Sequence, residues 1–219
     1  MPDHDAIADL PTSYQVHASS TVLHTGRVID VRTDVVVFPD GSRATRDVVV
    51  HPGAVGILAL DDAGRVLLIR QYRHAVRQQL WEPPAGLLDE PGEDPLDAAK
   101  RELFEEAHCE AARWDVLLDV FTTPGMADEA VRLYLARDVR PAEAPRHDAV
   151  DEERDMPIAW VDLDDAADRV LRGDLHNPLT AMGVLALVHA RRNDFTTLRP
   201  ADAPWPQMSP WPGSRAAPA

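Results

Sequence analysis

The feature that most constrains this chain is a helix, predicted to begin at Asp94, in the middle of strand-rich sequence. Asp94 is a favourable N-cap, Pro95 suits the first helical position, and Asp97 lies where the helix dipole favours a negative charge. Apolar residues recur along it at spacings of three and four positions: Leu96, Ala99, Leu103 and Ala107. This periodicity predicts an amphipathic helix with a single apolar stripe.

Short strands are predicted on both sides of this helix. The residues expected to form them are 21–23, 27–31, 34–38, 54–60, 65–72, 114–121, 131–136 and 158–161. A hairpin signal at Pro39–Ser42 and a turn at Asp61–Gly64 separate neighbouring strands. Two further helices are expected at Leu163–Leu171 and Pro178–Ala190, the second with Asn177 as its cap.

The composition narrows the range of partners. The chain has 37 acidic and 22 basic residues, a formal net charge of -15, which argues against nucleic acid or an anionic membrane as the main partner. A phosphate-bearing substrate would need a metal ion or a local arginine cluster to overcome this field. Cys109 is the only cysteine, so no internal disulfide can form and a reducing cytoplasm is expected. The N-terminus lacks the basic start of a signal peptide, and no apolar run reaches the roughly 18 residues of a membrane span.

Three glutamates gather on one turn of the predicted helix. Glu102 and Glu106 share a face, and Glu105 lies beside them, four residues after Arg101. A hard divalent cation relieves their mutual repulsion, and Mg²⁺ binds carboxylate oxygens while keeping room for waters and phosphate oxygens. The alternative is the solvated acidic face of an ordinary amphipathic helix. The glycine loop upstream, together with Glu93, favours the metal site.

The segment from Gly86 through Glu93 to Arg101–Glu106 closely resembles the Nudix box, G-x5-E-x7-R-E-U-x-E-E-x-G-U, in which U is aliphatic. The seven residues between Glu93 and Arg101 fit this pattern. Six residues, where the pattern has five, separate Gly86 from Glu93, and a loop tolerates such an insertion. His108 replaces the glycine that usually ends the helix with a positive φ, and histidine tolerates this conformation with some strain.

Other segments are similar to the ADP-ribose pyrophosphatase subgroup of this family, particularly its actinobacterial members. They are Arg70–Arg73, Leu80–Gly86 and Thr123–Glu129, within a similarity that runs from about Thr21 to Phe195. The resemblance implies an α/β (α+β) fold, namely a Nudix α/β/α sandwich with a mixed sheet, preceded by an N-terminal antiparallel β-sheet extension. It also implies a homodimer that uses Mg²⁺, with Mn²⁺ as an alternative.

On this basis four parts are expected along the chain. Residues 1–13 form a flexible leader, residues 14–50 a β-sheet dimerisation region, residues 51–197 the Nudix hydrolase domain, and residues 198–219 a Pro-rich tail. The tail is expected to be extended or disordered, because it shows many prolines and little periodicity.

The resemblance implies a role for each charged residue of the box. Glu102 and Glu106 are expected to bind the metal, with Glu105 assisting and the main-chain carbonyl of Ala85 as a further ligand. Arg101 is expected to orient Glu105 and the loop and not to touch the substrate.

Residues outside the box are expected to complete the site. Glu153, within the acidic segment Asp151–Arg154, aligns best with the carboxylate that orients the attacking water, a neighbouring glutamate or a solvated loop charge being the alternatives. Arg73 is expected to contact phosphate or ribose, or else to be a surface strand arginine. Arg46 is expected to reach a neighbouring subunit's substrate, or else to face solvent, and Glu129 to hold the ribose or its loop.

The predicted reaction is the hydrolysis of ADP-ribose, a small nucleoside diphosphate sugar, to AMP and ribose 5-phosphate. The first alternative is the same chemistry on another nucleoside diphosphate sugar or on a dinucleotide, because the box holds only the diphosphate. A non-catalytic regulator that binds ADP-ribose is less favoured, since a binding module has no need for three repelling glutamates. A structural protein is the last alternative. Walker, G-x-S-x-G and G-x-G-x-x-G motifs do not occur.

Overall fold

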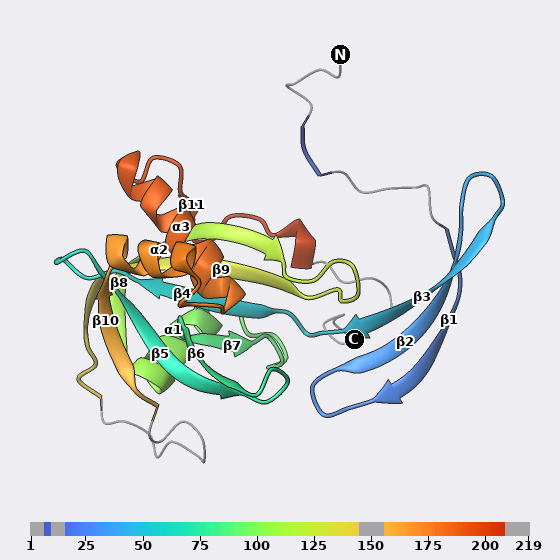
Figure 1. Ribbon diagram of the computed structural model, residues 1–219, viewed down its shortest axis with the longest axis horizontal. Coiled ribbons are helices and arrows are strands. Elements are labelled where there is room, and N and C mark those ends of the chain that lie inside the picture. The colour runs from blue at the N-terminus through green and yellow to red at the C-terminus, as the bar shows by residue number, and fades with distance from the viewer. Residues whose placement is uncertain (1–6, 10–15, 145–155, 209–219) are drawn as a thin grey trace.

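The computed structural model describes residues 7–9, 16–144 and 156–208 (Figure 1). Within these ranges the chain forms three sheets and three α-helices. None of the helices in these ranges combines the length and the apolar character that a membrane crossing requires.

The N-terminal sheet is antiparallel throughout and contains, in order, β1 (Val16–Thr25), β2 (Asp30–Val37) and β3 (Arg43–Val50). The hairpin predicted between β2 and β3 is confirmed. Phe38 N donates to Ser42 O at 2.9 Å, and Gly41 adopts a φ of +80°, which a residue without Cβ reaches at little cost.

This sheet is attached to the rest of the fold at the end of β3. Val49 N donates to Met126 O at 2.8 Å, and Asp128 N donates to Val49 O at 3.2 Å. His51 then donates its main-chain N–H to Asp128 Oδ1 at 2.8 Å. The strands themselves stand apart from the remaining sheets (Figure 1). Among the described residues, neither core cluster contains a side chain of β1 or β2.

Two sheets build the main body. The five-stranded sheet contains, in spatial order, β11 (Arg199–Pro200), β8 (Cys109–Phe121), β9 (Ala130–Pro141), β4 (Ala54–Ala59) and β7 (Ala85–Leu87). It is mixed, because β4 runs parallel to β9 and antiparallel to β7. The three-stranded antiparallel sheet contains, in order, β10 (Ile158–Asp162), β5 (Arg65–Arg73) and β6 (Gln78–Glu82).

Helices pack on both faces of the five-stranded sheet, with α1 (Pro95–Ala107) on one face and α3 (Pro178–Arg192) on the other. The remaining helix, α2 (Leu163–Arg172), packs against α3, β10 and β5. Successive residues of β4 point to opposite faces, as a strand requires. Ile57 joins the core cluster that contains Leu103 of α1, whereas Leu58 joins the cluster that contains Leu187 of α3. The predicted α/β fold, a sandwich with a mixed sheet and an N-terminal antiparallel sheet, is confirmed.

Helix ends lie where the sequence predicts them. Asp94 accepts from Leu96 N at 2.8 Å. At the other end of α1, His108 has φ 51° and ψ 43° and donates its main-chain N–H to Phe104 O at 2.9 Å. The left-handed C-cap is therefore kept although glycine is absent from it.

The C-terminal strap, which we define as residues 199–208, lies within the predicted Pro-rich tail and contacts the five-stranded sheet. It contains β11 and a short 3₁₀ helix, where an extended or disordered tail was expected. The buried Arg132 of β9 donates to Ala203 O at 2.8 Å, and its guanidinium lies 4.8 Å from the centre of the Trp205 ring. Side-chain partners on the sheet, which leave no periodic pattern in the sequence, thus contact this part of the segment that the sequence predicts to be extended or disordered.

Candidate active site

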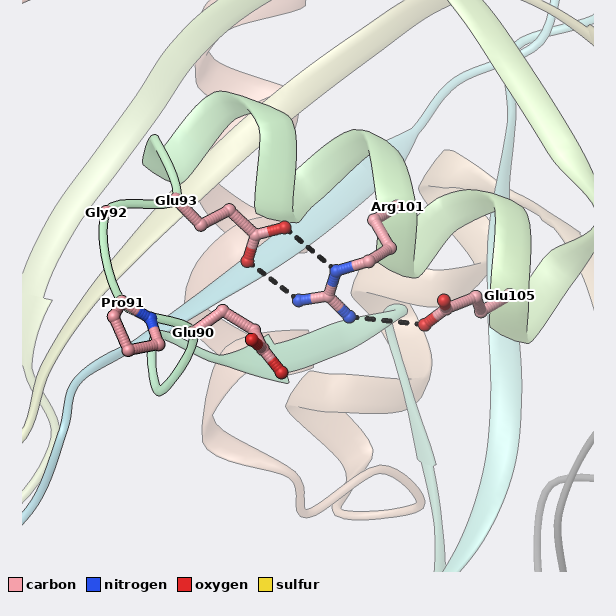
Figure 2. A pocket seen from close by; sticks show the side chains of 6 residues that line it. All are labelled: Glu90, Pro91, Gly92, Glu93, Arg101 and Glu105. Carbon is pink, nitrogen blue, oxygen red and sulfur yellow. Dashed lines mark hydrogen bonds and ion pairs between the residues drawn. The ribbon is translucent and has the colours of Figure 1, made fainter.

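A guanidinium in the middle of α1 gathers the charged residues of the box. Arg101 donates from Nε and from Nη2 to the two carboxylate oxygens of Glu93, both at 2.9 Å. Its Nη1 donates to Glu102 Oε1 at 2.6 Å and to Glu105 Oε2 at 3.2 Å. Figure 2 shows the bidentate pair with Glu93 and the contact with Glu105. One cation thus joins the loop that precedes α1 to two carboxylates of the helix.

These contacts shift the ionisation of both partners. The hydrogen bonds from Arg101 lower the pKa of Glu93 below its usual range. The hydrogen bonds to Glu93, followed by the charge of Glu102, raise the pKa of the Arg101 guanidinium. Three carboxylates formally share one guanidinium, so the group keeps a negative charge that a divalent cation would neutralise.

An open pocket of about 570 Å³ adjoins this group, and it is lined by Glu90, Pro91, Gly92, Glu93, Arg101 and Glu105 (Figure 2). Its volume is in the range of small-molecule sites. The loop that carries the extra residue of the box forms one wall, so the insertion lies at the rim of the pocket.

The first residues of β7 lie against the glutamates of α1. Ala85 N donates to Glu106 Oε2 at 2.9 Å, and Glu106 is 5% exposed. A Cβ atom placed on Gly86 would lie 2.0 Å from Glu102 Oε1, so only glycine leaves room for this carboxylate. The structure therefore brings Ala85 beside Glu106 and Gly86 beside Glu102, two of the three glutamates that the sequence assigns to the metal.

The chemistry of this donor set fits a hard divalent cation. The glutamates of α1 and the main-chain oxygen of Ala85 would supply the oxygen ligands that Mg²⁺ and Mn²⁺ prefer. In the described part of the chain, no three His, Cys, Asp or Glu side chains are gathered closely enough to share one ion. Arg101 and the Ala85 amide donate hydrogen bonds to these carboxylates instead, which lowers their repulsion without a metal.

Two further predicted residues make contacts of a different kind. Arg73 donates from Nε to Glu82 Oε1 at 2.9 Å, so the arginine of β5 is paired across the sheet with β6. Glu129 accepts a hydrogen bond from Thr122 Oγ1, and one of its oxygens lies 3.5 Å from His51 Nε2. Glu129 therefore contacts Thr122 and His51 in this structure.

Arg46 lies away from the box within this chain. It is exposed on β3, where its Nη1 donates to Thr45 O at 2.9 Å, and the sheet that carries it stands apart from α1 (Figure 1). Glu153 and the rest of the segment Asp151–Arg154 lie outside the described residues.

A buried polar group that was not predicted from the sequence lies behind Arg73. Glu82 is 1% exposed and Asn177 is 6% exposed, and the amide of Asn177 donates to Glu82 Oε2. The available signal was a glutamate that directly follows the apolar pair Leu80–Trp81 in a strand-like segment. A charged residue in such a position is seldom buried without a partner.

Comparison with known proteins gives a consistent family. The sequence profile of the NUDIX domain matches residues 50–180. An ADP-ribose pyrophosphatase of Mycobacterium tuberculosis (strain ATCC 25618 / H37Rv) is 48% identical over 187 residues, which cover 85% of this chain and 89% of that protein. An ADP-ribose pyrophosphatase of Bacillus subtilis (strain 168) is 35% identical over 162 residues, or 74% of this chain and 86% of that protein.

A solved structure extends the comparison to the fold. The crystal structure of an ADP compounds hydrolase superimposes with a TM-score of 0.72 and 20% sequence identity. The superposition covers 85% of this chain and 98% of the other chain. At this identity the likeness shows the arrangement of strands and helices.

Proposed function

This chain belongs to the NUDIX domain family, and from that premise we propose that it hydrolyses ADP-ribose to AMP and ribose 5-phosphate in the cytoplasm. The observation that carries the proposal is the set of α1 glutamates that lies against Ala85 and Gly86, beside a pocket of the size of a small ligand. The similarity to two ADP-ribose pyrophosphatases supports the choice of substrate. The segment Thr123–Glu129, downstream of the box and containing Pro124, is one of those that resemble the ADP-ribose pyrophosphatase subgroup.

The divalent ion in this proposal is Mg²⁺, with Mn²⁺ as the alternative, and Glu102, Glu105, Glu106 and the Ala85 carbonyl would hold it. When bound, the ion polarises a phosphoryl oxygen and lowers the pKa of a water molecule. Arg101 orients Glu102 and Glu105 before the ion arrives, because it already contacts both. A ligand set that is positioned in advance has less to reorganise on binding.

The remaining roles concern water and substrate. Glu153 accepts a proton from the attacking water, whose oxygen forms a bond to one phosphorus while the bond from that phosphorus to the bridging oxygen breaks. Arg73 contacts the diphosphate, and Glu129 holds the ribose or its loop. Arg46 reaches the substrate of the other subunit in a homodimer that is built through the N-terminal sheet.

Two alternatives share parts of this geometry. The same hydrolysis of another nucleoside diphosphate sugar or a dinucleotide needs no change in the glutamates of α1. A non-catalytic regulator that binds ADP-ribose needs the pocket but not the glutamates. The presence of Glu102, Glu105 and Glu106 on α1, with Glu105 lining the pocket, therefore favours an enzyme.

A substrate panel tests the proposal directly. The protein is incubated with Mg²⁺ and, separately, ADP-ribose, NADH, diadenosine diphosphate, GDP-mannose and UDP-glucose, and the products are identified. We expect the highest kcat/KM for ADP-ribose, with AMP and ribose 5-phosphate as products and with activity abolished by EDTA. A higher kcat/KM for another member changes the substrate but keeps the reaction class. Binding of ADP-ribose without any turnover would instead support the regulator.

A further inference from the structure

Glu82 is a carboxylate buried beneath an exposed arginine. Its side chain is 2% exposed, whereas the side chain of its partner Arg73 is 45% exposed. Arg73 Nε donates to both oxygens of Glu82, at 2.9 and 3.2 Å. In the part of the chain that the structure describes, no hydrogen bond engages the terminal nitrogens of this guanidinium. The ion pair thus connects the interior to the surface of the sheet and leaves the outer edge of the guanidinium for another partner.

Asn177 holds the other side of the same carboxylate. Its Nδ2 donates to Glu82 Oε2, and its Oδ1 caps α3 by accepting from Leu179 N at 2.8 Å and Thr180 N at 3.1 Å. Both halves of the amide are therefore used, one for the helix and one for the carboxylate. Because Asn177 is fixed by the helix, Glu82 is held between a rigid donor and Arg73.

Stability alone gives a weak reason for this arrangement. Burial raises the pKa of Glu82, and the charge of Arg73 only partly offsets that effect. Well-packed apolar side chains are often as stable as a buried ion pair, or more so. A fixed acceptor behind Arg73 does, however, give its guanidinium one orientation, which suits the recognition of phosphate oxygens.

We propose that Glu82 and Asn177 are positioning residues, which hold the Arg73 guanidinium so that its terminal nitrogens face the substrate diphosphate. This inference rests on the proposed function, in which Arg73 contacts the diphosphate. It adds α3 to the elements that shape the site. Glu82 also lies three residues before Ala85, so its bonds with Arg73 and Asn177 hold the strand that leads into the proposed metal site.

Two single substitutions disrupt the hydrogen bonds of Glu82 with Arg73 and Asn177, and the double variant that combines them restores these bonds. Glu82→Gln removes the charge that holds Arg73. Asn177→Asp keeps the helix cap, because aspartate caps as well as asparagine, but places a carboxylate against Glu82. In the double variant the new amide at position 82 donates to the new carboxylate at position 177, and its oxygen accepts from Arg73 Nε. The double variant therefore re-forms both hydrogen bonds and keeps the overall charge.

Kinetics on ADP-ribose separate positioning from structure. We expect each single variant to raise KM about tenfold, the value of one charge-assisted hydrogen bond, while kcat changes less than about threefold. The double variant should return KM to within about threefold of the wild-type value. Thr180→Val is the matched control, because it removes the bond from Thr180 Oγ1 to Trp81 O at 2.9 Å between the same elements without touching Arg73. It should lower the melting temperature and leave KM unchanged.

A second readout does not depend on turnover. The Nε–H proton of Arg73, observed by ¹⁵N NMR and assigned with Arg73→Ala, should exchange slowly in the wild type, rapidly in both single variants, and slowly again in the double variant. Single variants with wild-type KM, or with KM raised only as much as in Thr180→Val, would overturn the proposal, as would a rapidly exchanging Nε–H in the wild type. If the wild type cleaves another panel substrate instead of ADP-ribose, the proposed function fails. The same KM comparison on that substrate still tests whether Glu82 and Asn177 position Arg73.

Discussion

At the scale of single residues, the site depends on how closely side chains approach a main chain that lacks Cβ. The carboxylate of Glu102 lies so close to the main chain of Gly86 that a Cβ atom at this position would clash with it. Arg101 then holds that carboxylate from the other side. The position of Glu102 thus depends on the space left by Gly86 on one side and on the guanidinium of Arg101 on the other.

Gly86→Ala should therefore lower activity with little loss of stability. The added Cβ would displace the end of a flexible side chain, so the fold adjusts, but Glu102 moves from its place. A displacement of about 1 Å at a reacting group costs on the order of 10²-fold in kcat. Gly125→Ala is the control, because a Cβ there meets nothing within 4 Å. Similar kcat values for both variants would show that the site does not need the Glu102 position seen here.

The carboxylate that activates water gives a second prediction at this scale. Glu153→Gln should lower kcat by about 10²–10⁴-fold with little change in substrate binding, since a neutral amide cannot accept the proton. Glu152→Gln is the matched variant one residue away, and it should remain active. The reverse result would move the role to Glu152.

At the scale of elements, α1 ends on a strained residue. His108 has a φ of 51°, a conformation that costs a residue with Cβ about 1 kcal/mol. Its Nδ1 is also buried and, among the described residues, has no hydrogen-bond partner. Both features destabilise the folded chain, whereas the contact between the His108 and Phe104 rings, with centroids 5.4 Å apart, stabilises it.

His108→Gly should therefore raise the melting temperature. Relief of about 1 kcal/mol corresponds to roughly 2–4 °C for a chain of this length. Differential scanning calorimetry with EDTA present measures the effect without metal binding. A lower melting temperature would mean that the contact with Phe104 outweighs the strain.

Elements with a strong local pattern were predictable from the sequence, and those defined by partners were not. The helix from Asp94 and the cap at Asn177 follow from residues within one turn. The short strands β6 and β7 were missed, since a few residues carry too little periodicity. In the site, the glutamate spacing of α1 was readable, whereas the bond between Asn177 and Glu82 joins residues 95 positions apart. No local pattern records such a pair.

At the scale of the whole molecule, the N-terminal sheet has more apolar surface than its own chain covers. Val22 and Leu23 of β1 are 61% and 60% exposed. An exposed apolar surface of this kind is unfavourable in water, and the edges of an open sheet invite pairing. A symmetric dimer that buries these strands resolves both problems.

A mixing experiment tests the dimer and the role of Arg46 together. Arg46→Ala and Glu102→Gln homodimers should each be weakly active. If Arg46 acts across the interface, a heterodimer of the two has one native site, so its activity should rise towards half of the wild-type value after co-refolding. No gain on mixing would place Arg46 in the site of its own subunit. Sedimentation at micromolar concentration is the prior check, and a monomer there ends the dimer proposal.

The contacts of the C-terminal strap also predict when it docks during folding and when it opens. The bond from Arg132 to Ala203 closes a loop of 71 residues that includes α2 and α3, and such closure follows the local contacts. Apart from β11, the strap is held by the hydrogen bonds from Arg132 to Ala203 O and Pro204 O and by its packing on the sheet, whereas the strands are joined by continuous main-chain ladders, so we expect its opening to need less free energy than separation of the sheet strands. Amide protons of Ala203 and Met208 should therefore exchange with deuterium before those of β4 and β9. We expect the strap to dock last and leave first, and the changing surroundings of Trp205, one of five tryptophans, to alter the fluorescence of the chain in both events.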